Sequence, residues 1–194
     1  MHIPVRDQCL QLLDSMQMPM HIQAHSRIVC EVALVLADGL NAAGVPLNRD
    51  LIRASALLHD ITKPRSFKTG ENHARTGGEY LNGLGFYEVG EIVRQHVVLD
   101  QWLPPDSPQA DAVGGQAPGE AEVVNYADKR VLHDQVVSLD ERMAYILHRY
   151  ARTPERRQLM IHFWERAEAL EKLIFGYLAF GPERLGEQLA ATQP

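Results

Sequence analysis

A histidine and an aspartate stand side by side in the stretch LLHDITKPRSF, residues 57–67. An apolar run precedes His59 and Asp60, and two cations, Lys63 and Arg65, follow within a few residues. Imidazole and carboxylate groups are both ligands of divalent transition metals. The pair therefore raises the question of what two polar groups do at the buried end of a helix.

Three further polar residues lie on apolar helical stripes, where side chains point inward. His25, His96 and Asp128 each have aliphatic residues three or four positions away. A single buried histidine is most often a hydrogen-bonded core residue, but a buried ionised carboxylate is costly unless it is paired or bound to a metal. Together with His59 and Asp60, these residues suggest a convergent metal-ligand set. Spacing alone leaves a hydrogen-bonded polar core open, because the residues come from different helices.

The elements that would position these residues are helices. Apolar residues recur every three or four positions almost throughout the chain, and we see no internal repeat and no convincing strand. The fold class is therefore predicted to be all-α. Asn48, Asn72, Ser138 with Glu141, and Thr153 with Pro154 are typical of helix starts. The predicted helices cover residues 5–16, 21–43, 48–59, 72–83, 87–97 and 120–134, followed by helices that begin near 138, 153 and 181.

One segment fits no helix or strand pattern. Residues 98–118 belong to the stretch VLDQWLPPDSPQADAVGGQAPG, which carries four prolines and three glycines. A loop of this length in a compact domain is usually a functional lid or a disordered segment.

Composition excludes some classes of protein. The chain has 194 residues, of which 45% are hydrophobic, and a net charge of -6. A core of useful size is expected, whereas general nucleic-acid binding is not, because such binders usually carry a basic surplus. The N-terminal residues lack a signal-peptide apolar region, and the apolar run 32–37 is far too short to cross a membrane. We expect a cytoplasmic protein, with Cys9 and Cys30 as packing residues.

The ordered set of polar residues resembles the HD-domain superfamily of metal-dependent phosphohydrolases. That family presents a histidine, a His-Asp pair, further histidines and a final aspartate, in this order, on one helical core. The resemblance covers roughly residues 20–135. It rests on the motifs AHSRIV, LLHDITKP, NHARTGGEYL, IVRQHV and NYADKRV, which contain His25, His59, Asp60, His73, His96 and Asp128.

The resemblance implies a metal centre with one or two divalent ions per chain. The metal could be Fe, Mn, Mg, Co, Ni or Zn, which the sequence does not distinguish. In the family, two extra histidines distinguish binuclear from mononuclear members, and His73 and His96 match them. Asp60 matches the aspartate that bridges both ions. The residues that match the minimal mononuclear ligand set are His25, His59, Asp60 and Asp128.

Residues outside the ligand set are expected to act on a phosphorylated substrate. Lys63 matches a lysine that contacts phosphate in relatives, so Asp60 and Lys63 are the predicted catalytic residues. Lys63, Arg65 and Lys129 are the predicted substrate-binding residues, although Arg65 and Lys129 would serve equally well on a solvated surface. A bound divalent ion lowers the pKa of water and draws charge from phosphoryl oxygens, which is the chemistry of hydrolysis.

Departures from the family pattern narrow the class of substrate that we expect. Thr62 stands where many relatives of the His-Asp-Ile-Gly type have glycine. The second histidine and the Gly-Tyr-Pro motif of cyclic-dinucleotide phosphodiesterases are replaced by Val97 and LDQWLPPD. The chain is closer to small bacterial members that hydrolyse nucleotides or dinucleoside polyphosphates. We expect a small phosphorylated substrate, such as a nucleotide, and no membrane partner.

The resemblance also predicts the domain organisation. An HD-domain helical bundle would cover residues 1–135, and helices packed on it would form a C-terminal extension, residues 136–194. The apolar stripe of the extension would suit a homodimer. Two alternatives to a phosphohydrolase remain: a di-iron oxygenase built on the same six ligands, and a non-catalytic sensor module, which usually lacks some of the ligands.

Overall fold

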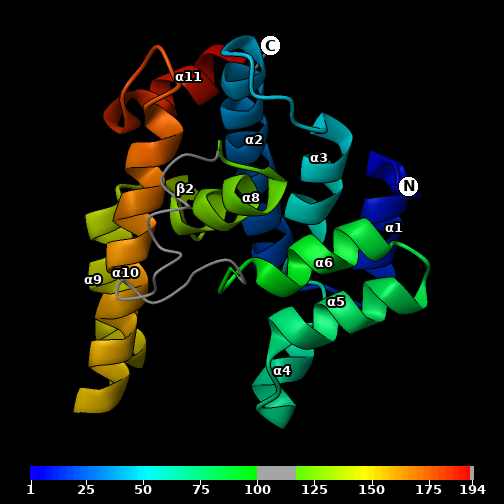
Figure 1. The fold of residues 1–194 in the computed structure, drawn as a ribbon. Helices are drawn as coiled ribbons and strands as arrows, with labels where there is room; N and C mark the ends of the chain where they lie inside the picture. The colour runs from blue at the N-terminus through cyan, green and yellow to red at the C-terminus, as the bar shows by residue number, and fades with distance from the viewer. Residues whose placement is uncertain (100–116, 193–194) are drawn as a thin grey trace, which may run out of the picture.

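The computed structural model describes residues 1–99 and 117–192, which form a helical bundle with one small hairpin (Figure 1). The predicted all-α fold is confirmed. In chain order the elements are α1 (Arg6–Ser15), α2 (Met20–Ala42), α3 (Arg49–Leu58), α4 (Lys63–Thr69), α5 (His73–Gly83), α6 (Tyr87–Gln95), α8 (Glu120–Lys129), β1 (Val131–Leu132), β2 (Gln135–Val136), α9 (Leu139–Tyr150), α10 (Pro154–Phe175), the 3-10 helix η1 (Pro182–Arg184) and α11 (Leu185–Thr192).

The predicted helix starts are confirmed by side-chain caps. The side chains of Asn48 and Asn72 each accept hydrogen bonds from two backbone N–H groups of the following turn. Ser138 caps α9, and Thr153 caps α10 ahead of Pro154. Each cap satisfies N–H groups that have no partner inside the helix, so the sequence determines where these helices begin.

The prediction of no strand is wrong at one place, and the helix predicted over 120–134 is too long. Helix α8 ends at Lys129, and β1 pairs antiparallel with β2. His133, at the turn, has a φ of 56°, a left-handed backbone conformation that a continuing helix excludes. Val131 is fully buried although it lies outside the helix, so its apolar character continued the helical spacing of α8 in the sequence. The short helix α4 was also not predicted.

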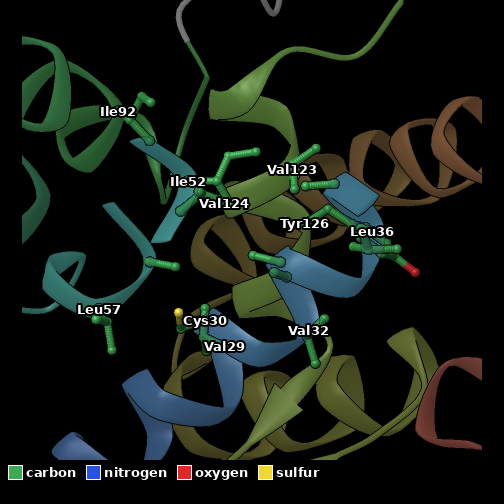
Figure 2. Packing of buried hydrophobic residues seen from close by; sticks show 14 of the residues in the cluster. Val29, Cys30, Val32, Leu36, Ile52, Leu57, Ile92, Val123, Val124 and Tyr126 are labelled. Atoms are coloured by element: carbon green, nitrogen blue, oxygen red, sulfur yellow. The ribbon is translucent and has the colours of Figure 1, made fainter. Parts of the chain in front are cut away.

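The core lies around α2, whose apolar face is fully buried. Figure 2 shows Ile52 of α3 beside Val124 of α8, in the same buried cluster as Val29 and Val32 of α2. All four side chains are completely inaccessible to water. Burying an aliphatic side chain of this size contributes about 1.5–3 kcal/mol, so this contact surface holds α2, α3 and α8 together.

The C-terminal helices pack on the same core. Helix α10 packs against α8 and α9, and α11 against α2. In Figure 1, α8 lies between α6 on one side and α10 on the other. The division of the chain at residue 135 stays a prediction.

Most of the predicted loop, residues 100–116, lies outside the described residues. Among the helices of residues 1–99 and 117–192, none has an apolar stretch of the length that a bilayer crossing requires.

Candidate metal centre

The His-Asp pair sits where α3 ends. His59 is the C-cap of α3, and the side chains of His59 and Asp60 are essentially inaccessible. A helix leaves its last carbonyl groups without intrahelical partners. The Nδ1 of His59 lies 2.8 Å from the carbonyl oxygen of Ala56, one of these groups. Burial of the pair at the helix end thus has a local cause, because the imidazole satisfies the open carbonyl.

Helix α6 repeats this arrangement. His96 is its C-cap, and the Nδ1 of His96 lies 2.7 Å from the carbonyl oxygen of Val93. A third histidine, His25 on α2, has its Nδ1 2.8 Å from the carbonyl oxygen of His133 in the β1–β2 turn. A carbonyl oxygen only accepts hydrogen bonds, so the Nδ1 of each ring carries the proton. The Nε2 of each ring faces inward and is an electron-pair donor whenever it does not carry a proton.

The first ligand group joins α2, the end of α3 and α8. The Nε2 of His25 lies 3.0 Å from Asp128 Oδ1. The Nε2 of His59 lies 3.3 Å from Asp60 Oδ2 and 3.7 Å from Asp128 Oδ1. One ligand atom each from His25, His59 and Asp60 fall within 4.8 Å of one another. The four residues that the resemblance assigned to a mononuclear site are therefore brought together.

The second ligand group shares Asp60 with the first. The Nε2 of His73 lies 3.3 Å from Asp60 Oδ1, and the Nε2 of His96 lies 3.7 Å from the same oxygen. The two Nε2 atoms are 3.2 Å apart. Asp60 thus presents Oδ2 to His59 and Oδ1 to His73 and His96, the arrangement that a bridging carboxylate needs.

Glycines and a threonine position the second group. A Cβ on Gly78 would lie 2.7 Å from the carbonyl oxygen of Gly90, so only glycine lets α5 and α6 approach this closely. The Oγ1 of Thr62 donates to the carbonyl oxygen of His73 at 2.9 Å. This bond ties the start of α5 to the residues after the His-Asp pair. The residue that departs from the glycine of relatives thus holds His73 beside Asp60.

The donor set fits a divalent cation. Two buried atoms at its centre, His59 Nε2 and Asp60 Oδ1, have no hydrogen-bond partner among the described residues. Metal–ligand bonds of about 2.0–2.2 Å place neighbouring ligand atoms about 2.8–3.6 Å apart. The His25–Asp128, His59–Asp60 and His73–Asp60 separations of 3.0, 3.3 and 3.3 Å fall in this range. Electron pairs that face one another without a proton between them are stabilised by a cation.

The charge states of the ligands also suit a metal. Burial alone would raise the pKa of the Asp60 carboxyl, but His59 and Lys63 hold it well below its usual value. Burial likewise opposes ionisation of Asp128, and its neighbours outweigh this effect and lower its pKa. Burial lowers the pKa of His96 to about 3, so the ring is neutral at pH 7. Metals bind ionised carboxylates and neutral imidazoles.

Lys63 lies at the edge of the centre. It begins α4, and its Nζ donates to Asp60 Oδ2 at 2.7 Å. Burial opposes its charge, but Asp60 and Asp128 raise the pKa of the ammonium. Because the side chain is 28% exposed, the ammonium is accessible to a ligand that approaches from solvent.

The other two predicted substrate-binding residues lie differently. Arg65 points away, with its Nε 2.6 Å from Glu71 Oε1 and about half of its side chain exposed. Lys129 donates to the side chain and the backbone carbonyl of Asn125, and burial lowers the pKa of its ammonium to about 8. The side-chain amide of Asn125 donates in turn to the carbonyl oxygen of His96. The structure thus connects Lys129 to the backbone of His96 through Asn125 and pairs Arg65 with Glu71.

One residue at the centre was not predicted. Arg142 of α9 has its Nη2 3.9 Å from Asp128 Oδ1. The sequence offers no signal for it, because an arginine in the first turns of a capped helix is usually solvated.

Comparison with known proteins settles the family. The HD domain family model matches residues 22–131, a range that holds all six predicted ligands of the centre. The chain belongs to the HD-domain family. The resemblance drawn from the sequence is thereby confirmed.

Curated relatives of this HD-domain chain are distant. It is 30% identical over 147 residues to tRNA (cytidine(56)-2'-O)-methyltransferase of Picrophilus torridus, a match that covers 73% of this chain and 40% of the relative. It is 27% identical over 131 residues to an uncharacterized protein of Methanocaldococcus jannaschii, covering 63% of this chain and 76% of that protein. It is 29% identical over 122 residues to Ribonuclease Y of Fervidobacterium nodosum, a match that covers 60% of this chain and 23% of that protein. No solved structure matches.

Proposed function

We propose that the protein is a metal-dependent phosphohydrolase that acts on a nucleotide or another small phosphate ester. The observation that carries the proposal is the charge balance of the centre. Asp60 is paired with Lys63, and Asp128 has Arg142 beside it. Two cations thus match two carboxylates before any divalent ion is added. Each added ion leaves two uncompensated positive charges, which match the charge of a phosphate monoester dianion.

Family membership supports the same chemistry. The HD domain is typical of metal-dependent phosphohydrolases. One relative is named for ribonuclease activity, but the match covers less than a quarter of that protein. A short RNA is therefore included among the substrates of the test below. The methyltransferase name is no guide to this centre, because the match covers less than half of that protein.

The residues of the centre would fall into two groups, one for each metal ion. His25, His59, Asp60 and Asp128 would hold one divalent ion, and Asp60, His73 and His96 a second. When bound, such ions supply an activated nucleophile at neutral pH and withdraw charge from the phosphoryl group. Both oxygens of Asp60 are then committed to the metal centre, so the Asp60 carboxylate is not available as a proton carrier.

Lys63 would act on the substrate. Its ammonium already contacts Asp60 Oδ2, and its partial exposure lets it turn toward a phosphoryl oxygen. There it stabilises the negative charge that develops in the transition state. A lysine suits this role because its ammonium is a mobile point charge with three donors.

The test begins with the metal content of protein purified without added metal. Phosphate release is then measured across mononucleotides, dinucleoside polyphosphates and a short RNA, with Mn²⁺, Mg²⁺, Co²⁺ or Zn²⁺ added separately. We expect metal-dependent release that chelation abolishes. If no phosphate ester is cleaved with any metal, and the Fe²⁺-loaded protein instead consumes O₂, the proposal fails and an oxygenase takes its place.

A further inference from the structure

The buried arginine of α9 carries donors that the described protein does not satisfy. The side chain of Arg142 is only 14% exposed. Its Nε is buried and has no hydrogen-bond partner among the described residues. A guanidinium has five N–H donors in one plane, and leaving a buried donor unpaired is costly. A ligand that supplies hydrogen-bond acceptors would satisfy this unpaired donor.

Asp128 is not a sufficient partner for Arg142. The 3.9 Å between Nη2 and Asp128 Oδ1 is longer than a hydrogen bond. The same Oδ1 is the atom that lies 3.0 Å from His25 Nε2, so it belongs to the metal-ligand group. A cation bound there would reduce its attraction for the guanidinium further. Among the described residues, the ion pair of this guanidinium is thus with a carboxylate that the metal-ligand group already uses, so Arg142 can take an anion from solvent.

Two cations lie beside the carboxylates of the metal-ligand group. The Nζ of Lys63 lies 2.7 Å from Asp60 Oδ2, and the Nη2 of Arg142 lies 3.9 Å from Asp128 Oδ1. Lys63 arises from α4 and Arg142 from α9, so cations from two separate elements converge beside carboxylates that already face metal-ligand histidines. With a divalent ion added, this arrangement carries an excess of positive charge, which a multiply charged anion stabilises.

We propose that Arg142 binds the phosphoryl group of the substrate, donating from two N–H groups to two of its non-bridging oxygens. The inference deepens the proposed function and rests on it. Guanidinium suits the role because its planar pair of donors matches two oxygens of a phosphate. The C-terminal helices thereby contribute a substrate-binding residue to the centre.

Inorganic phosphate is the probe for this proposal. Its binding to the full chain loaded with Mn²⁺ is measured by isothermal titration calorimetry, and metal content is measured on the same samples. Arg142→Met removes the charge and keeps much of the side-chain volume, whereas Arg142→Lys keeps the charge and loses the paired donors. Arg149→Met is the matched control, since Arg149 is an exposed arginine of the same helix.

Arg142→Met should weaken phosphate binding by about 10- to 100-fold, the range expected for loss of charged hydrogen bonds, with metal content unchanged. Arg142→Lys should lie between Arg142→Met and the wild type, and Arg149→Met should match the wild type. Loss of metal from Arg142→Met would overturn the assignment and make the arginine a support for Asp128. Phosphate affinity within twofold of wild type would also overturn it, while leaving the proposed function intact if the wild type hydrolyses esters. A wild type that neither binds phosphate nor cleaves esters would end both proposals.

Discussion

Two buried polar clusters meet at the end of α8, and they differ in how their hydrogen-bond donors match their acceptors. The metal centre uses Asp128 in the last turn of α8, and a second cluster forms around Arg130, its C-cap. The Nε of Arg130 donates to the carbonyl oxygen of Val137 at 2.7 Å, and its Nη2 to that of Pro182 at 2.8 Å. Its Nη1 lies 3.1 Å from Glu171 and also contacts the hydroxyl of Tyr126. Every nitrogen of this guanidinium has an acceptor.

The metal centre has the reverse composition. Histidine Nε2 atoms and carboxylate oxygens face one another, and two of the atoms have no partner among the described residues. A polar cluster in which donors match acceptors stabilises the fold by itself, as the Arg130 cluster does between α8, α10 and η1. A cluster with acceptors in excess is stabilised by a bound cation. Counting donors against acceptors therefore separates a structural cluster from a functional one.

The largest effect that this comparison predicts follows from Asp60→Ala. Loss of the carboxylate shared by both ligand groups should lower metal-dependent turnover about a thousand-fold or more, since metal catalysis supplies several kcal/mol of transition-state stabilisation. Far-UV circular dichroism should stay that of a helical protein, because the apolar core is untouched. Turnover near the wild-type value would contradict the assignment of the centre.

The next largest effect falls on stability. Arg130→Met removes the cation beside Glu171 and one donor to each of two carbonyl oxygens, so the free energy of unfolding should fall by about 3 kcal/mol. Urea denaturation measures this loss, and Arg157→Met, at an exposed position of α10, is the control. Metal content of the folded variant should equal that of the wild type. If Arg130→Met lost metal as completely as Asp60→Ala, the two clusters would not be separate.

Added metal should stabilise only one of the clusters. A divalent ion at about 100 times its dissociation constant contributes about 2.7 kcal/mol, which corresponds to a rise in Tm of about 5–10 °C for a chain of this size. Differential scanning calorimetry of metal-free and metal-loaded protein measures the rise. It should persist in Arg130→Met and vanish in Asp60→Ala. An equal rise in both variants would place the ion elsewhere.

The smallest predicted effect is a twofold change in the number of metal ions per chain. If Asp60 bridges two ions, the wild type should contain about two per chain, and His73→Ala should retain about one on the remaining ligands. Inductively coupled plasma mass spectrometry measures the content, with the exposed His148→Ala as control. One ion in both the wild type and His73→Ala would mean a mononuclear centre.

Helical periodicity accounts for most of what the sequence predicted. It placed His25 and His96 on buried faces, because the direction of a side chain on a helix follows from its position. His73 begins α5 and is partly exposed, so periodicity gave no direction for it, and only the family resemblance included it.

What the sequence did not predict depends on tertiary contacts. Arg142 meets Asp128 only through the path of the chain after α8, which includes a hairpin that was itself not predicted. Arg65 was included in a local basic cluster, but Glu71 lies within reach and pairs with it. Charge counted along a chain does not reveal which partner each side chain takes.

The partners of the histidine Nδ1 atoms set the order in which the centre can assemble. His59 and His96 are each oriented by a carbonyl three residues earlier, so each ring is positioned as soon as its own helix forms. His25 depends on the carbonyl oxygen of His133, which is 108 residues away along the chain. Contacts at such separation close late in folding. The group built on Asp60, His73 and His96 comes from one short stretch of chain, so it needs fewer long-range contacts than the group that joins His25 to Asp128 across 103 residues.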